Sequence, residues 1–163
     1  MDNTLKATAV VLRELKCYSI QTLQDRILLQ KKIFLAQDIG VPLKYGFCWY
    51  LHGPYSTDLT EDVYQIIPEG LEVIQNLKLD EKYQKKINLV NELEDKTCNK
   101  IFSSLTVVQR YELIASVAYW FSLGKKRKEE SVKQIQYAKP QFNKEQIENA
   151  FLLYTDFRKN GTN

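Results

Sequence analysis

Histidine, cysteine and long apolar runs are scarce in this sequence of 163 residues, and each scarcity limits what the protein can be. The single histidine is His52, and the three cysteines, Cys17, Cys48 and Cys98, lie far apart without a CxxC pair. This odd number and this spacing argue against a disulfide framework and against a zinc site. We therefore expect three reduced thiols, mostly buried, and neither a metal nor a cofactor.

Long apolar runs are also missing. No stretch approaches the roughly 18 apolar residues that cross a bilayer. The opening stretch, MDNTLKATAVVLREL, has no basic leader followed by a small-residue cleavage site. We therefore expect a cytoplasmic protein with no membrane partner. The composition, 44% hydrophobic and 26% charged, favours one compact domain over residues 1–163, with a helix-strand-turn-helix half at 1–80 and a helical half at 81–159.

Helical periodicity covers most of the chain. Apolar residues recur at helical spacing in stretches that we predict to be helices: residues 4–16, 23–39, 57–67, 81–100, 106–122, 129–138 and 143 onward. The stretch 23–39 is apolar around most of its circumference, so this helix should run through the centre of the core. Asn143, with Gln146 three residues later, fits a capping box for the last helix. The tail, residues 158–163, should fray.

One segment has the character of a strand. Residues 45–52, YGFCWYLH, alternate with a period of two and carry aromatic side chains on both faces. Gly53 and Pro54 should end this strand, because proline lacks the ladder donor. Residues 71–79, LEVIQNLKL, fit a helix or a strand, and we favour a short strand that pairs with the first as a wing. The predicted fold is mainly α, with a small antiparallel β element and a winged-helix-like N-terminal half.

Two stretches together resemble a known family. LLQKKIFLAQDIG followed by YGFCWYLHGPYSTDLTEDVYQI is similar to the YwgA-like bacterial proteins, distant relatives of the Panacea domain of SocA-type antitoxins and phage-associated proteins. Their shared pattern is a helix with Gln-Lys, an aromatic strand that ends in Gly-Pro-Tyr-Ser, and a further helix, here Gln30, Lys31, Gly53, Pro54, Tyr55, Ser56 and Leu59. YELIASVAYWF and AKPQFNKEQIENAF resemble the C-terminal half of the group through Lys139, Pro140 and Phe142. His52 departs from the aromatic residue that is usual there.

The resemblance implies a function in binding. YwgA-like proteins have no established reaction, and their Panacea relatives neutralise a toxin or pass it to a protease. We therefore expect a non-enzymatic protein-binding module, antitoxin-like or an adaptor. Its partner would be a toxin, a protease adaptor or a subunit of a defence complex. The expected surface holds Tyr50, Tyr55 and the helix at 58–65, because tyrosine gives a large contact area at low entropic cost.

The stretch YLHGPYSTDL, residues 50–59, also allows a catalytic interpretation, as a small hydrolase. His52 would be the base for Ser56 or Cys48. Strand rise separates Cys48 and His52 by roughly 13 Å, which excludes a direct pair. His52 and Ser56 straddle a turn and can meet, but only Asp58 or a distant carboxylate is left to orient the imidazole. This interpretation has the least support.

The same stretch allows anion binding. A helix that starts near Ser56 or Thr57 has free N–H groups that bind phosphate or a carboxylate, with help from His52 or Lys31. The Ser56 and Thr57 hydroxyls would occupy some of these donors as caps.

The interpretation that we favour is structural. Gly53 allows the chain to leave the strand sharply and Pro54 fixes that turn. Tyr55 would pack on the central helix with its hydroxyl bonded. Gln30 and Lys31 would then satisfy backbone groups of the turn.

A winged-helix DNA-binding regulator is the alternative function. The helix at 57–67 would enter the major groove, and a hairpin near 71–79 would touch the backbone. Asp58, Glu61 and Asp62 on this helix argue against it, because phosphates repel carboxylates. The net charge of +3 is small, but one basic run offers candidate nucleic-acid contacts, or a solvated loop that caps the preceding helix: Lys125, Lys126, Arg127 and Lys128.

Overall fold

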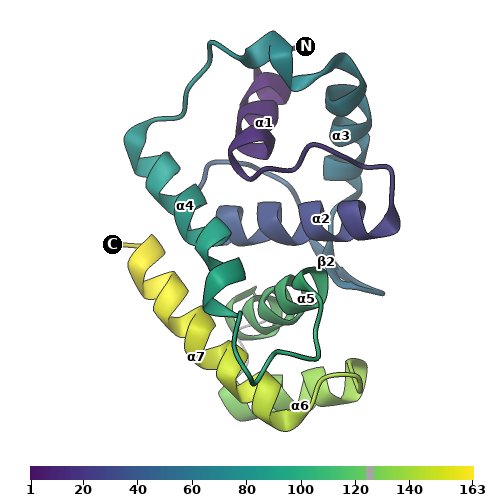
Figure 1. The fold of residues 1–163 in the computed structure, drawn as a ribbon, viewed down its shortest axis with the longest axis vertical. Helices are drawn as coiled ribbons and strands as arrows, with labels where there is room; N and C mark the ends of the chain where they lie inside the picture. Colours follow the sequence, from purple (N-terminus) through teal and green to yellow (C-terminus); the bar gives the residue numbers. More distant parts are fainter. Residues whose placement is uncertain (124–126) are drawn as a thin grey trace.

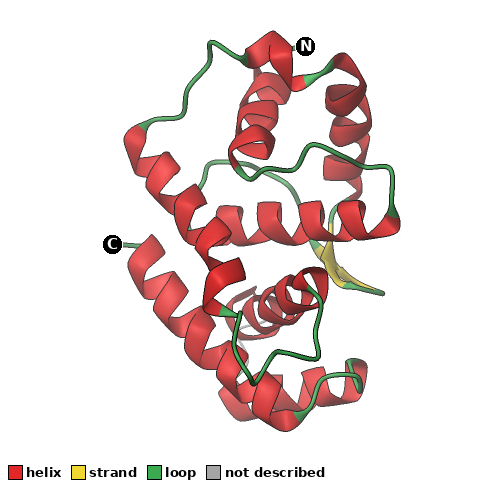
Figure 2. Cartoon of the chain, viewed as in Figure 1, coloured by secondary structure: helices red, strands yellow, loops and turns green. Residues whose placement is uncertain are grey.

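The computed structural model describes residues 1–123 and 127–163. This part of the chain is mainly helical and contains one two-stranded antiparallel sheet, as the sequence predicts (Figures 1 and 2). None of the helices found in it combines the length and the apolar character that crossing a bilayer requires. The elements follow one another as α1 (Asn3–Glu14), α2 (Leu23–Asp38), β1 (Cys48–Tyr50), β2 (Gly53–Tyr55), α3 (Thr57–Glu69), the 3₁₀ turn η1 (Leu71–Ile74), α4 (Glu81–Lys96), α5 (Val107–Ala118), the π-helical turn η2 (Tyr119–Leu123), α6 (Lys128–Ala138) and α7 (Lys144–Gly161).

Helix α2 is the centre of the fold, as its apolar circumference predicts. It crosses the middle of the molecule in Figure 1, with α1 and α3 on one side and α5 on the other. Its main packing partner is α5, and it also contacts β2, α4 and α1. Even Gln30, Lys31 and Lys32 of this helix are buried. A capping box between Thr22 and Asp25 fixes its N-terminus.

The predicted caps of two other helices are confirmed. The Ser56 hydroxyl accepts from the backbone N–H of Leu59 at the start of α3. Asn143 and Gln146 form the expected capping box of α7. Both caps use short side chains that satisfy N–H groups which a helix leaves without a partner.

The prediction that residues 158–163 fray is wrong, because α7 continues through Gly161. Gly161 is buried against Ile39, and a β-carbon on it would lie 2.8 Å from Cβ of Ile39. Lys86 Nζ donates to the carbonyl oxygens of both Ile39 and Gly161. The end of α7 is therefore held by the end of α2 and by α4.

The sheet is a hairpin, and this corrects two predictions. The strand predicted at 45–52 is limited to β1, and its partner is the Gly53-Pro54-Tyr55 segment that was expected to end it. Tyr50 pairs with Gly53 across the loop of Leu51 and His52. Gly53 adopts a φ of 91°, which favours glycine. Pro54 is tolerated because each strand of a two-stranded sheet is an edge strand.

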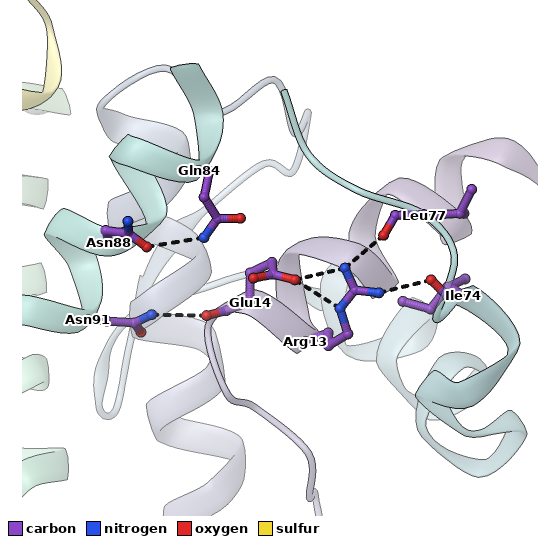
Figure 3. A network of polar contacts seen from close by, with 7 residues as sticks. All are labelled: Arg13, Glu14, Ile74, Leu77, Gln84, Asn88 and Asn91. Carbon is purple, nitrogen blue, oxygen red and sulfur yellow. Dashed lines mark hydrogen bonds and ion pairs between the residues drawn. The ribbon is translucent and has the colours of Figure 1, made fainter. Parts of the chain in front are cut away.

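Residues 71–79 do not form the predicted strand, so the wing of a winged helix is missing there. They form η1 and then a loop that packs on α1. Figure 3 shows the reason: the Arg13 guanidinium donates to the carbonyl oxygens of Ile74 and Leu77, at 2.9 and 2.8 Å. Asn91 of α4 donates to the carbonyl of Glu14 at 2.9 Å, beside Arg13. Arg13 thus takes two carbonyls of residues 71–79 that a strand ladder would need.

The cysteines are free, as expected, but they are not mostly buried. Cys17 is buried, whereas Cys48 and Cys98 are exposed. Burial raises the pKa of the Cys17 thiol to about 11, although Lys32 opposes the change. Cys17 is therefore a neutral core residue at physiological pH.

Candidate functional site

A cavity of about 280 Å³, here called the hairpin pocket, opens where α2, α3 and the hairpin meet. Its apolar lining comes from α2, α3 and the segment before α2, and includes Ile20, Ile27 and Val63. Tyr50, Tyr55 and Tyr64 add aromatic rings. The ring centroids of Tyr50 and Tyr55 lie 5.5 Å apart. Pockets of this size and apolar character are the usual sites for small ligands or for an anchoring side chain.

Lys31 lines the pocket from the central helix and is fully buried. Its Nζ donates to the carbonyl oxygen of Pro54 at 2.7 Å. Burial lowers the pKa of Lys31 from its ordinary 10.5 to about 7, although the Glu112 carboxylate opposes this change. Lys139 lowers this pKa further. Lys31 therefore changes charge near neutral pH, which exposed lysines do not do.

A buried ion pair also contacts the hairpin. Lys139 Nζ is 2.6 Å from Glu112 Oε1, and both side chains are buried. The same Nζ donates to the carbonyl of Leu51 at 2.7 Å and lies 5.5 Å from the centre of the Trp49 ring. Lys139 and Lys31 thus hold two carbonyls of one hairpin from two different parts of the chain. We call Lys31, Glu112 and Lys139 the lysine–glutamate cluster.

Gln30 fixes the next residue of the turn, as the structural interpretation predicts. Its Nε2 donates to the carbonyl of Ser56, and its Oε1 accepts from the N–H of Ser56, both at 2.9 Å. Its Nε2 also lies 2.9 Å from Thr60 Oγ1, which in turn donates to the Tyr55 hydroxyl at 2.8 Å. The predicted roles of Gln30, Lys31 and the Tyr55 hydroxyl are confirmed. Helix α2 therefore bonds the Gly-Pro-Tyr-Ser motif at Pro54 and Ser56, and α3 bonds it at the Tyr55 hydroxyl.

The catalytic arrangement proposed around His52 is not assembled in the described residues. His52 Nδ1 lies 4.0 Å from Glu112 Oε1, which is the distant carboxylate that the sequence left open. Ser56 is buried and caps α3, and the Cys48 thiol donates to the carbonyl of Tyr55 at 3.6 Å. Both candidate nucleophiles therefore have other hydrogen-bond partners, and His52 is among the partners of neither.

Anion binding at the start of α3 stays a prediction. Lys31 already donates one of its N–H groups to the carbonyl of Pro54. Asp58 is exposed in the first turn of the helix and adds a negative charge. Ser56 already occupies the N–H of Leu59.

The basic run is described only in part, because Lys125 and Lys126 lie outside the described residues. Arg127 is exposed and pairs with Glu130 at 3.0 Å. Lys128 begins α6, with its Nζ 6.0 Å from the centre of the Phe151 ring. Arg127 therefore pairs with the first turn of α6. The expectation that lysines of this run cap the end of the preceding helix stays a prediction.

Sequence reasoning missed several residues that build the site. Glu112 has a sequence signal, since it is the single acidic residue within the apolar run YELIASVAYWF. Ser116, whose Oγ donates to the Glu112 carbonyl at 2.7 Å, has no such signal. The family resemblance includes Lys139 as a motif residue but predicts no role for it in the fold. The sequence patterns do not single out Arg26, which lines the pocket.

Comparison of the chain with family models, with curated proteins and with solved structures found no match. The likeness to the YwgA-like and Panacea group, and the function that it implies, therefore stay predictions.

Proposed function

We propose that this chain is a non-enzymatic protein-binding module, antitoxin-like or an adaptor, and that its partner docks on the surface around the hairpin pocket. The observation that supports this is a group of large apolar side chains on that surface. Four of them, between 51% and 73% exposed, form what we call the hairpin face: Leu23, Tyr50, Leu51 and Tyr64. Leu23, Tyr50 and Tyr64 also line the pocket. Apolar groups gathered at a pocket are typical of protein interfaces.

The rigidity of the hairpin supports the same function. Lys31 and Lys139 hold two carbonyls of the hairpin, and Gln30 holds the residue that follows it. Tyr50 and Leu51 are therefore displayed from a backbone that is fixed before any partner arrives. A fixed surface loses less conformational entropy on association, which favours affinity.

The two other functions have weaker support. DNA binding through α3 would bring exposed carboxylates, Asp58 and Glu61, against phosphates. Asp62, on the same helix, accepts a hydrogen bond from the Tyr45 hydroxyl at 2.7 Å. A hydrolase would need His52 to engage a nucleophile, and Ser56 and Cys48 are otherwise bonded.

The test is affinity purification of the tagged chain from its native host, with and without nuclease, followed by mass spectrometry. The test variant is Tyr50→Ser/Leu51→Ser in the hairpin face. The matched control is Tyr137→Ser/Leu152→Ser, which removes one exposed tyrosine and one exposed leucine from α6 and α7.

We expect one stoichiometric protein that survives nuclease, is lost with the hairpin variant and is kept with the control. Circular dichroism must show that both variants fold. Recovery of nucleic acid alone, or equal loss of the partner in both variants, would contradict the proposal.

A further inference from the structure

The charge of the hairpin pocket is one-sided. Its lining includes three basic side chains, Arg26, Lys31 and His52, and no aspartate or glutamate. Glu112, whose Oε1 lies 4.0 Å from His52 Nδ1, is paired with Lys139 at 2.6 Å, so its charge is compensated. The rest of the lining is apolar or uncharged. An occupant that is mostly apolar and carries one negative charge fits such a lining best.

Arg26 is placed to receive that charge. Its Nη1 donates to the carbonyls of Ile20 and Gln21, at 2.8 and 3.2 Å, which anchors one side of the guanidinium. Within the described residues its Nε and Nη2 make no hydrogen bond to protein atoms; the Asp25 carboxylate, whose pKa Arg26 helps to lower, is bonded to Ser19 and Thr22. An anchored guanidinium with free N–H groups is the usual receptor for a carboxylate.

The volume limits the size of the occupant. Because one water molecule takes about 30 Å³ in the liquid, the cavity of about 280 Å³ holds roughly nine water-sized groups. That is the size of a benzene ring on a short acid chain. It is too small for a folded element of a partner.

We propose that the hairpin pocket binds a small organic acid, an apolar group of about this size joined to one carboxylate that pairs with Arg26. The apolar group lies against Ile27 and Val63, among the tyrosine rings. Lys31 adds positive potential from another wall when it is protonated. This proposal does not depend on the proposed function, since a pocket filled by a small acid requires no protein partner.

The test uses three probes of nearly the same shape, followed by ¹H–¹⁵N NMR on the full chain. They are 3-phenylpropanoate, its neutral amide, and 3-phenylpropan-1-amine. For a ligand of this size we expect the acid to bind with a Kd of about 1–5 mM, with shifts at Ile27, Tyr50 and Val63. We expect the amide to bind at least fivefold more weakly and the amine not at all.

Arg26→Gln is the test variant and Arg127→Gln, on the exposed start of α6, is its matched control. Arg26→Gln should weaken acid binding to the level of the amide and leave amide binding unchanged, while Arg127→Gln should change neither. Equal binding of all three probes, shifts outside the pocket, or no binding of the acid would each overturn the proposal. If Arg26→Gln fails to fold, the comparison of the acid with the amide on the natural sequence still decides it.

Discussion

Gln30 and Gln37 lie seven positions apart on α2, and each exchanges two hydrogen bonds with the backbone of one residue outside the helix. Gln30 bonds Ser56 twice at 2.9 Å, and Gln37 bonds Tyr45 at 2.8 and 3.0 Å. The two glutamine amides thus replace the partners that a third strand would give to the segment on either side of the hairpin. The central helix therefore fixes the backbone path of this segment, in addition to packing against it.

The two glutamines should differ in their effect on stability. Gln30→Met leaves the buried N–H of Ser56 without a partner, while the Ser56 carbonyl keeps the backbone N–H and the hydroxyl of Thr60, so we expect a loss of about 1–3 kcal/mol of unfolding free energy. Gln37→Met is the matched variant and should cost about 1 kcal/mol, because water reaches the half-buried Tyr45 backbone. Urea unfolding measures both. Equal losses of unfolding free energy in the two variants would show that burial of the backbone groups does not determine the cost of removing their partner.

The buried ion pair should be sensitive to loss of one partner and tolerant of loss of both. Glu112→Gln leaves the buried Lys139 ammonium without its anion, and we expect a loss of about 3–5 kcal/mol. Adding Lys139→Met should recover part of this loss, because no buried charge is then left. Glu81→Gln is the control: it removes an exposed pair with Lys85 and should cost below about 0.5 kcal/mol. A double variant as unstable as Glu112→Gln would contradict this explanation.

Stability should rise with pH above neutrality because of Lys31. Its pKa is about 7 in the folded protein and near the ordinary 10.5 in the unfolded chain. The unfolded chain therefore binds more protons between these values, and unfolding becomes less favourable as pH rises through this window. The slope of the unfolding free energy is at most about 1.4 kcal/mol per pH unit. Below pH 7 Lys31 is charged in both states, and burial of this charge lowers the stability by its full amount.

Urea unfolding at pH 7 to 8.5 measures this slope for the natural sequence and for Lys31→Met. The variant should lack the contribution of Lys31, whereas Lys133→Met, which removes an exposed lysine of α6, should retain it. The range stops below pH 9 because the raised pKa of Cys17 opposes the trend from there upward. Parallel slopes for all three proteins would rule out a neutral Lys31.

Gly53 in the hairpin and Gly46 in the segment before it should differ in how much stability an added β-carbon costs. Gly53→Ala places a β-carbon at a φ of 91° and 3.0 Å from Ser116 Oγ, so we expect a loss of about 1–3 kcal/mol. Gly46→Ala meets no atom within 4 Å, and its φ is not positive. It should change stability by less than about 1 kcal/mol. Thermal unfolding measures the loss of stability in each variant. If Gly53→Ala were as stable as the natural sequence, the hairpin loop would rearrange without cost.

The features that sequence reasoning predicted depend on neighbouring residues. The burial of α2 follows from its apolar circumference, and the caps at Ser56 and Asn143 follow from side chains next to the helix start. The hydrogen-bonding role of Gln30 and Lys31 was also predicted, since both precede the hairpin on a helix that packs beside it.

The features that it missed depend on residues far apart in the chain. Gly53 and Pro54 argue against a strand locally, and the hairpin forms nonetheless because Lys31 and Lys139 hold its carbonyls. Residues 71–79 have strand-like composition, but Arg13 takes two of their carbonyls. Such long-range partners are outside the reach of periodicity and propensity.

The hydrogen bond from Lys139 to Leu51 spans 88 positions of the chain, and this has a consequence for the order of folding. Contacts between residues far apart in sequence close large loops and form slowly. During synthesis the hairpin emerges long before Lys139, so its final shape waits for the C-terminal half to emerge and dock. The pocket is therefore among the last parts of the molecule to mature, and a nascent chain has no finished surface to offer a ligand or a partner.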